Sequence, residues 1–383
     1  MTTIPVWKDI LMTLEGIAYY RFFLHKTQFW SREQIEAYQF SKLKKLLMIS
    51  GQNVPYYREL FSAIKFDVAR DFRTLKDMEK IPLLTKKEAR ANKDKLINPL
   101  YRLKSFPMRT SGSTGEPFEV MVSFNAWVVE QAVVWRHWAW GGYRFRDQMA
   151  IVRSYSPKPG DPLIRHDSLR NFTYYSPFHL NDEMLGLYLK DMIKRKTKII
   201  RGYPSSVFTL AEFVKRTGAE IPTIKMILTA SEVLTDAERA VVENVLKARI
   251  SNHYGLAEVC VMMGDCEKHE GLHNYDEYGY LELLPATIEN YKAVVGTHLH
   301  NYAMPLIRYE TGDMAELADK PCSCGRSLQT VKNIAGRKDV SIRTPEDYKI
   351  PTVNFYTMFE KMSKVKKWQI IQRQIDQLEV IVH

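Results

Sequence analysis

The sequence has few cysteines and no long apolar run. Only 4 of its 383 residues are cysteine, which argues against a small scaffold stapled by disulfides. No run of 18 apolar residues occurs, so we expect no membrane-spanning helix. The first residues, Met1-Thr-Thr-Ile-Pro-Val-Trp-Lys8, lack the basic region and apolar core of an export signal. These absences favour a cytoplasmic protein.

The composition is that of an ordinary globular protein. Hydrophobic residues make up 45% and charged residues 26% of the chain, and the length fits one large and one small domain. The net charge of +11 would suit nucleic acid, an anionic membrane surface or small anionic substrates. Lysine and arginine are scattered, without the arginine-aromatic arrays of RNA-binding proteins. We therefore expect a nucleotide ligand and no nucleic-acid partner.

One stretch, Arg109-Thr-Ser-Gly-Ser-Thr-Gly-Glu-Pro117, is rich in small hydroxyl residues and glycine. Gly112 and Gly115 permit a close approach of the main chain to a ligand. Hydroxyl and amide groups can surround phosphate oxygens. The stretch holds no lysine and does not end in Gly-Lys-Ser/Thr, so it differs from the usual phosphate loop. A phosphate-binding loop and an ordinary surface loop both fit this pattern.

The N-terminal part of the chain is predicted to form a helical layer over residues 8–50. Ser31, with Gln34 three residues later, matches a capping box at a helix start. Thr85, followed by an acid three residues on, is expected to begin another helix. Residues 54–58 contain proline and are expected to be a connection.

The middle of the chain alternates strands and helices, which predicts an α/β layer architecture. Strands are expected at 118–122, 198–202, 226–232 and 248–254, and helices at 125–140, from Ser205 to Arg216, and at 236–246. Ser205 is the expected N-cap of the second of these helices. Ligands of open α/β sheets bind at the carboxyl ends of strands, so Thr229, Ser231 and Glu232 are site candidates. Residues 279–284 and 294–299 are expected to form strands of an antiparallel or mixed sheet.

Two later carboxylates also follow predicted strands. Glu258 comes soon after the strand at 248–254, where it would either cap a helix N-terminus or bind a metal ion. Asp313 follows Thr-Gly at a strand end, where it could accept hydrogen bonds from two ribose hydroxyls. A turn is the alternative for Asp313, because Gly-Asp is common in turns.

The order of four motifs resembles the adenylate-forming (acyl-CoA synthetase) superfamily. The motifs are Thr110-Ser-Gly-Ser-Thr-Gly115, Tyr254-Gly-Leu-Ala-Glu258, Thr311-Gly-Asp313 and Gly336-Arg-Lys-Asp339. Each is weak alone, but the ordered set is specific and covers about residues 50 to 345. Val54-Pro-Tyr-Tyr-Arg58, Arg201-Gly-Tyr-Pro-Ser205, Gly271-Leu-His273 and Cys322-Ser-Cys-Gly-Arg326 further resemble the phenylacetate–CoA ligase branch, especially relatives found with capsular polysaccharide genes.

This resemblance implies binding roles for named residues. The residues that would bind the ATP phosphates are Thr110, Ser111, Gly112, Ser113, Thr114 and Gly115. Ser231 and Glu232 would lie near adenine, and Tyr254 and Gly255 would line the adenine or acyl pocket. Asp313 would bind the ribose hydroxyls. Glu258 would hold Mg²⁺, Arg337 would lie beside ribose or phosphate, and Asp339 would be the hinge of a small domain. Many relatives have a lysine after the phosphate loop, where this chain has Glu116-Pro-Phe118.

The implied function is ATP-dependent activation of a small carboxylic acid through an acyl-adenylate, followed by transfer to coenzyme A. An adenylyl transferase of the same branch and a degenerate nucleotide-binding fold without turnover are the alternatives. The implied fold is a large adenylation domain of mixed sheets layered with helices, residues 1–338, and a small, incomplete α+β lid domain, residues 339–383. A homodimer is left open.

The cysteines fall in two regions and suggest a structural zinc site. Cys266, Cys322 and Cys324 would supply three thiolates and one histidine the fourth ligand. The branch's Gly-Leu-His pattern favours His273, with His269 as the alternative. Four unlinked cysteines remain a third possibility. The remaining cysteine, Cys260, is expected in a helix after Glu258, as a buried thiol.

The last 44 residues after Asp339 are expected to hold a helix at 353–362 and a hairpin across residues 374–376. Relatives carry, near their end, a lysine that reaches the acyl phosphate. Lys338, Lys364 and Lys366 come too early in the chain to match it. Either the chain is truncated or adenylation relies on Mg²⁺ and Arg337, and we expect slow adenylate formation despite ATP binding.

Overall fold

The computed structural model describes most of the chain in two compact units. The described residues are 6–109, 118–158, 160–232, 234–286, 291–337, 341–343, 345, 349–351 and 368–382. Unit 1 comprises Met1–Gly112, Pro117–His137 and Tyr254–Lys338, and unit 2 comprises Ser113–Glu116, Trp138–His253 and Asp339–His383. The separate lid domain at 339–383 stays a prediction.

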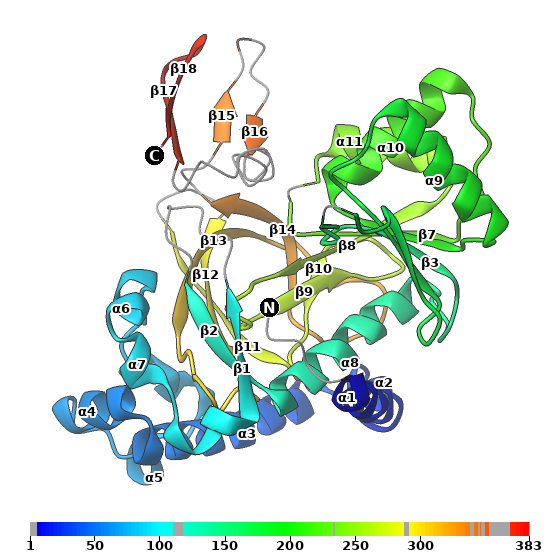
Figure 1. Ribbon diagram of the computed structural model, residues 1–383. Coiled ribbons are helices and arrows are strands. Elements are labelled where there is room, and N and C mark those ends of the chain that lie inside the picture. Colours follow the sequence, from blue (N-terminus) through cyan, green and yellow to red (C-terminus); the bar gives the residue numbers. More distant parts are fainter. Residues whose placement is uncertain are drawn as a thin grey trace. The chain divides into compact units, whose positions relative to one another are not determined.

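Unit 1 begins with a series of helices, drawn in blue in Figure 1. They are α1 (Val6–Tyr19), the π-helical η1 (Tyr20–Leu24), α2 (His25–Thr27), α3 (Arg32–Asn53), α4 (Pro55–Ala63), α5 (Val68–Asp71), η2 (Leu75–Lys80), α6 (Lys86–Ala91), α7 (Lys93–Leu96) and η3 (Pro99–Lys104). The predicted capping box is present at the start of α3, where Ser31 and Gln34 each accept the other's amide hydrogen bond. Thr85 caps α6 as predicted.

The predicted connection at residues 54–58 was wrong, because the chain forms helix α4 there. Pro55 occupies the first turn of α4, where a missing amide hydrogen costs no helical bond. Tyr57 and Phe61, four residues apart, are both buried on one face of this helix. The proline therefore starts a helix that packs into the core.

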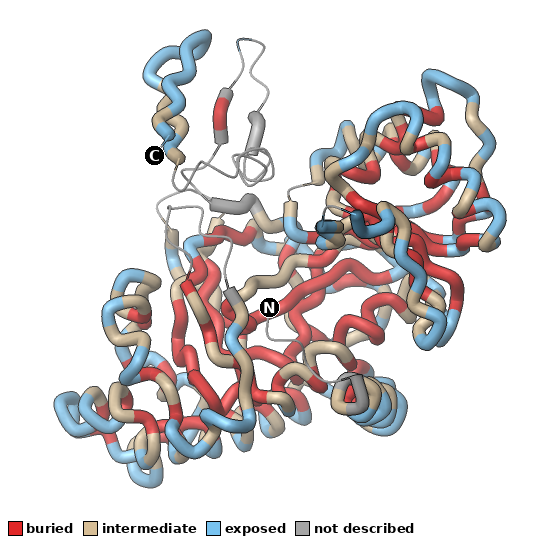
Figure 2. Tube along the Cα trace, viewed as in Figure 1, coloured by how far each residue is buried: buried red, intermediate tan, exposed pale blue. Residues whose placement is uncertain are grey.

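The strands of unit 1 form antiparallel pairs. β1 (Ser105–Arg109) pairs with β2 (Glu119–Ser123), and a second set runs in the order β11 (Gly279–Pro285), β12 (Tyr291–His298), β13 (Tyr309–Leu317), β14 (Thr330–Arg337), β10 (Leu272–Asn274) and β9 (Met262–Asp265). The strands predicted at 279–284 and 294–299 correspond to β11 and β12, and of the two predicted arrangements these strands form an antiparallel pair. Buried residues, red in Figure 2, run along these strands.

Unit 2 contains a mainly parallel set of strands. Its order is β8 (Arg249–Gly255, whose last two residues belong to unit 1), β7 (Met226–Ala230), β6 (Ile199–Gly202), β3 (Met149–Val152), β5 (Phe172–Tyr175) and β4 (Ile164–Asp167), with only β4 antiparallel to its neighbour. The helices are α9 (Asp182–Lys194), α10 (Pro204–Thr217) and α11 (Asp236–Leu246), and α8 (Phe124–Trp140) enters from unit 1. Alternate strand residues such as Val152, Ile200 and Ile227 join α9–α11 in one apolar core. The mixed α/β fold class is confirmed.

The C-terminal strands are β15 (Ser341–Arg343), β16 (Lys349–Pro351), β17 (Trp368–Gln374) and β18 (Gln377–Val382). β17 and β18 pair as the predicted hairpin. The helix predicted at 353–362, together with Lys338, Lys364 and Lys366, lies outside the described residues. Among the helices that the structure does describe, none is both long and apolar enough to cross a membrane.

Three local predictions were wrong. No helix follows Glu258, which lies in a turn between β8 and β9; Val259 has a φ of 51°, outside the helical region. Asp313 lies inside β13 rather than at a strand end. Ser205 is not the N-cap of α10, because Tyr203 holds that position and Pro204 begins the helix.

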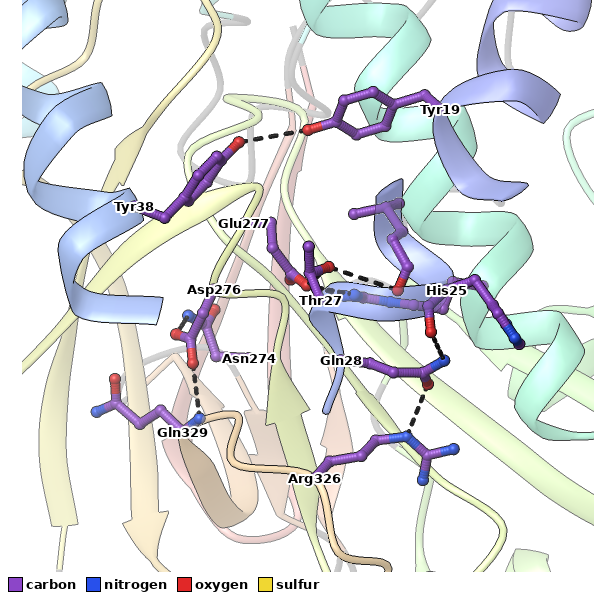
Figure 3. Close-up of polar contacts among 12 residues, drawn as sticks. Tyr19, His25, Thr27, Gln28, Tyr38, Asn274, Asp276, Glu277, Arg326 and Gln329 are labelled. Carbon is purple, nitrogen blue, oxygen red and sulfur yellow. Dashed lines mark hydrogen bonds and ion pairs between the residues drawn. The ribbon is translucent and has the colours of Figure 1, made fainter. Parts of the chain in front are cut away.

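A buried polar chain connects the N-terminal helices to the strand region of unit 1. Tyr19 and Tyr38 place their hydroxyls 3.3 Å apart, as Figure 3 shows. The Tyr38 hydroxyl lies 3.2 Å from His300 Nε2, which donates to the Glu277 carbonyl oxygen at 2.9 Å. Burial, aided by the charge of Lys42, lowers the pKa of His300 to about 4. The folded protein therefore holds this imidazole neutral.

We predict that the stability of the protein falls as the pH falls, and that His300→Gln makes this decline shallower. An unfolded histidine titrates near 6.5, so between that pH and about 4 the unfolded chain binds one more proton at His300 than the folded chain does. Stability is therefore full above pH 6.5 and falls on acidification, by about 1.4 kcal/mol per pH unit for this group. Urea unfolding at pH 7, 6 and 5 should give a shallower decline for His300→Gln. The same substitution at exposed His25 should leave the slope unchanged; equal slopes for all three proteins would contradict the prediction.

Candidate nucleotide and metal sites

Tyr254 and Asp313, predicted from separate motifs, meet in unit 1. The Tyr254 hydroxyl, at the end of β8, donates to Asp313 Oδ2 at 2.6 Å. Burial, together with the Asp313 charge, raises the pKa of Tyr254 well above its usual value, so the phenol stays a donor. Both residues are at least half-buried. The two side chains therefore form a hydroxyl–carboxylate contact between the end of β8 and β13.

A bulge in β13 sets the position of Asp313. Ala293 pairs with Met314 and Val295 with Glu310, so residues 311–313 all lie opposite Val294. Gly312 has a φ of 79°, which favours glycine. Thr311 donates its hydroxyl to the Val294 carbonyl oxygen at 2.9 Å and accepts the Asp313 amide at 3.0 Å. The Thr-Gly-Asp sequence therefore folds locally to orient this carboxylate.

Glu258 is buried and already bonded within unit 1. Its Oε1 lies 3.2 Å from Lys86 Nζ and accepts the Tyr309 hydroxyl at 3.1 Å. Lys86 is held there because Leu84 exchanges backbone hydrogen bonds with β13, at 2.9 Å to the Arg308 oxygen and 3.0 Å from the Glu310 amide. Lys86 was not predicted, because its sequence context shows no feature beyond its place at a helix start.

Ser231 and Glu232 lie at the carboxyl end of β7 in unit 2. Ser231 has a φ of 74° and accepts a hydrogen bond from Arg153 at 3.1 Å. Glu232 accepts the Ser205 amide at the N-terminus of α10, at 3.0 Å, a position that favours a carboxylate. Burial raises the pKa of Glu232 nevertheless. Thr229, also predicted, donates to Asn252 at 2.9 Å.

Most of the remaining nucleotide candidates lie outside the described residues. Thr110, Ser111, Gly112, Ser113, Thr114 and Gly115, with Glu116, Pro117 and Asp339, lie outside the described residues. The backbone of Arg337 pairs with Asp313 across β13 and β14, and Gly255 ends β8. Their binding roles stay predictions.

The four predicted zinc ligands converge in unit 1. The sulfur atoms of Cys266, Cys322 and Cys324 and a ring nitrogen of His273 all lie within 4.8 Å of one another. Cys266 Sγ and Cys322 Sγ are 3.6 Å apart, and Cys324 Sγ is 3.5 Å from His273 Nε2. A tetrahedral zinc ion with bonds of about 2.3 Å to sulfur and about 2.0 Å to nitrogen requires ligand separations of roughly 3.5 to 3.8 Å. The arrangement fits such a closed site.

Neighbouring groups hold these ligands in place. The Glu270 carboxylate accepts the Ser323 amide at 2.7 Å and its hydroxyl at 3.0 Å, which fixes the Cys322-Ser-Cys324 turn. The Lys268 amide donates to Cys266 Sγ at 3.4 Å. Thr330 Oγ1 lies 3.4 Å from the other ring nitrogen of His273. Metal-binding histidines commonly have such an outer partner.

Burial determines the protonation of the cluster. It raises the pKa of Cys266 and of Cys322, and lowers that of His273 to about 4. Burial also acts to raise the pKa of Cys324, but hydrogen bonds from Arg326 outweigh it and bring that pKa below the usual range. Cys324 is therefore the thiol best prepared to lose its proton to a metal.

The alternative ligands lie elsewhere. His269 Nδ1 is 3.1 Å from Asp265 Oδ2, and Cys260 is buried against Gly296. Neither belongs to the cluster, although His269 and His273 are close in sequence. His273 is selected because β10 pairs with β14 next to the cysteine turn.

Comparison with known proteins supports the resemblance. No family model matches the chain. A phenylacetate–coenzyme A ligase of Thermus thermophilus is 29% identical over 332 residues, covering 80% of this chain and 71% of that protein. The Staphylococcus aureus protein CapK is 24% identical over 338 residues, covering 86% and 74%. The chain therefore resembles phenylacetate–CoA ligase-like proteins of the adenylate-forming family.

A solved structure supports the fold of this ligase-like protein. The open conformation of 2-hydroxyisobutyryl-CoA ligase, in complex with 2-HIB-AMP and CoA, matches with a TM-score of 0.65 and 18% identity, covering 93% of this chain and 83% of that one. At this identity the match concerns the fold alone. It agrees with the mixed α/β architecture described above.

Proposed function

We propose that this chain activates a small carboxylic acid with ATP and transfers the acyl group to coenzyme A. The Tyr254–Asp313 contact carries the proposal, because it joins two of the four family motifs through one 2.6 Å hydrogen bond. The phenylacetate–CoA ligases at 25–29% identity support the same reaction class. The cytoplasm, where thiols stay reduced, is the proposed location; all four cysteines are free.

The first half-reaction joins a carboxylate oxygen to the α-phosphorus of ATP and releases pyrophosphate. In the second, the coenzyme A sulfur attacks the acyl carbon, AMP leaves, and the thiol proton goes to solvent. Because a carboxylate is a weak nucleophile and the phosphates repel it, orientation and charge neutralisation provide the catalysis. We assign the phosphates to residues 110–115, adenine to Ser231 and Glu232, and ribose to Asp313. We assign Arg337 to ribose or phosphate binding and Asp339 to the hinge of a small domain.

Glu258 is our proposed Mg²⁺ ligand. A carboxylate is a suitable oxygen donor, and Mg²⁺ would neutralise phosphate charge when bound. However, Lys86 already neutralises Glu258 at 3.2 Å. We propose that Lys86 moves from Glu258 toward the phosphates when nucleotide and metal arrive. With Mg²⁺ bound, the buried carboxylate of Glu258 would keep a counter-ion after Lys86 leaves.

The Cys266, His273, Cys322 and Cys324 cluster is our proposed structural zinc site. Three thiolates and one imidazole are a common structural zinc set, and all four positions would be filled by protein. The site joins the loop after β9, strand β10 and the turn at 322–324. Its role is therefore to fix these segments to one another, with no open position for substrate.

Asp313→Ala should weaken ATP binding by about tenfold or more. Losing hydrogen bonds from two ribose hydroxyls to a charged acceptor costs roughly 1.5–3 kcal/mol. Isothermal titration with ATP measures the change directly. Tyr254→Phe is the matched control, since it removes the hydroxyl-carboxylate bond but keeps both the ring and the Asp313 charge. Unchanged ATP affinity in a folded Asp313→Ala variant would exclude the ribose role.

ATP–pyrophosphate exchange with a panel of aryl and aliphatic acids tests the whole proposal. Acid-dependent exchange followed by acyl-CoA formation supports the ligase. Exchange without acyl-CoA, but with transfer of AMP to another acceptor, supports the adenylyl transferase. ATP binding without exchange for any acid would favour a nucleotide-binding fold without turnover.

A further inference from the structure

Arginine and aromatic side chains gather at the carboxyl end of the parallel strands in unit 2. Ile151 of β3 pairs with Tyr174 of β5 and with Arg201 of β6, so these three side chains stand on one face of the sheet. Arg153 follows β3 by one residue, and Tyr203 follows β6 by one residue. This is the edge at which open α/β sheets bind ligands.

Each guanidinium group of this cluster lies over an aromatic ring. Arg153 is 5.1 Å from the Tyr203 ring centroid, Arg165 is 4.8 Å from that of Tyr174, and Arg201 is 4.9 Å from that of Trp138. Stacking of this kind fixes the plane of a guanidinium group while leaving its edge open for hydrogen bonds.

Arg153 has donor capacity that the protein leaves unused. Its Nη2 donates to Ser231 Oγ at 3.1 Å, and the Tyr203 side chain is a further hydrogen-bond partner of the guanidinium group. Its Nη1 is closed off from solvent and has no hydrogen-bond partner among the described residues. An unpaired charged donor in such a position is costly, and an anionic ligand is one way to satisfy it.

The carboxylates near this cluster are engaged elsewhere. Glu232 lies within electrostatic reach of Arg153, but its carboxylate accepts the Ser205 amide at 3.0 Å and forms no ion pair with Arg153 within the described part of unit 2. Burial and the charge of Asp167 raise the pKa of Tyr174. The Asp167 carboxylate also pairs with Arg170 at 3.0 Å. The cluster therefore keeps a positive charge at the ligand-binding edge.

We propose that Arg153 binds a second anionic group of the acid substrate, so that the preferred acid is a dianion such as a dicarboxylate. This inference rests on the proposed function. Nη1 of Arg153 donates to an oxygen of that group, and the Tyr203 ring packs against the acid's body. The chemistry recognised is an oxyanion beside an aromatic surface, which a nucleotide phosphate could also supply.

The reacting carboxylate is the less suitable partner for Arg153. An oxygen that attacks phosphorus needs a free electron pair, and pairing with a guanidinium group engages carboxylate oxygens in strong hydrogen bonds. A carboxylate at the far end of the acid has no such requirement. Arg153 therefore acts as a specificity residue, and it leaves the reacting end of the acid to the nucleotide site.

The test compares acids that share a carbon skeleton and differ by one charge. Glutarate is paired with pentanoate, and 1,4-phenylenediacetate with phenylacetate, in calorimetric binding and ATP–pyrophosphate exchange. The wild-type chain should prefer the dianion by about tenfold to a hundredfold, the range for hydrogen bonds to a charged group. Arg153→Gln should abolish the preference, and Arg153→Lys should retain part of it.

Arg249→Gln is the matched control, because this exposed arginine begins β8 at the opposite end of the same strands. It should keep the full preference. Equal use of monoanions and dianions by the wild-type chain would overturn the inference and leave the proposed function standing. Weakened ATP binding in Arg153→Gln, with the acid preference unchanged, would assign Arg153 to a nucleotide phosphate and also overturn it. If the wild-type chain binds none of the acids and shows exchange with none of them, both the inference and the proposed function are overturned.

Discussion

Cys266→Ser should lower bound zinc from about one ion per chain to below about a tenth. Cys266 is 1% exposed and contributes one of the four convergent donors. Structural zinc supplies ~10–16 kcal/mol of binding free energy in small domains, and we expect at least about 4 kcal/mol of it to appear as lost stability. Elemental analysis of protein purified without chelator, followed by urea unfolding, measures both effects.

Two matched variants make the zinc prediction specific. Cys260→Ala removes the one cysteine outside the cluster, and His269→Gln removes the neighbouring histidine that instead lies near Asp265. Both should keep one zinc ion per chain. A chain that contains no zinc before any substitution would refute the site, whatever the variants then show.

Acidification should release the ion, because protons compete for thiolates and imidazole. Chelator alone at neutral pH should have the same effect on stability as Cys266→Ser, since both leave the cluster without its ion. Loss of stability without loss of zinc would instead indicate that Cys266 serves packing alone.

Local features of this chain were predictable because few residues determine them. The capping box at Ser31 and Gln34 depends on atoms three residues apart. Helix α11 begins and ends at the predicted residues, Asp236 and Leu246, because its apolar spacing and its cap agree. The β17–β18 hairpin follows from two alternating segments around a short turn.

Features that depend on distant pairing could not be predicted in the same way. The bulge that orients Asp313 exists because β12 and β13 pair with a shifted register, which neither strand's sequence reveals alone. Lys86 meets Glu258, 172 residues away, because Leu84 exchanges backbone hydrogen bonds with Arg308 and Glu310 at the start of β13. Such contacts depend on topology, and a lysine at a helix start gives no indication of them.

The zinc ligands were predicted partly from the spacing of the cysteines and partly from a family resemblance. Cysteine clustering indicated a possible metal site, but the choice between His269 and His273 came from a family resemblance. The structure supplies the physical reason, since strand pairing brings His273 to Thr330 and the cysteine turn. Arg153 was not predicted, because no strand was expected at residues 149–152, where the structure has β3.

Arg136 and Glu277 form a fully buried ion pair in unit 1. Two hydrogen bonds join the guanidinium to the carboxylate, at 2.7 and 3.1 Å, and both side chains are 0% exposed. Thr27 donates a further hydrogen bond to Glu277, and Figure 3 shows these two side chains together. Burial acts to raise the pKa of Glu277, but Arg136 outweighs it and lowers that pKa. The carboxylate therefore stays charged.

Glu277→Gln should destabilise the chain by about 3–5 kcal/mol, because it leaves the Arg136 charge buried without a counter-ion. Arg136→Met should cost a similar amount for the converse reason. The double variant Arg136→Met/Glu277→Leu should cost much less than the two single changes together, since it removes both charges and fills the space with apolar atoms. The control is Glu59→Gln, which breaks an exposed pair with Lys95 at 2.7 Å and should cost at most about 1 kcal/mol. Urea midpoints at constant slope measure all four variants, and additive costs in the double variant would show that the pair itself is not what stabilises this region.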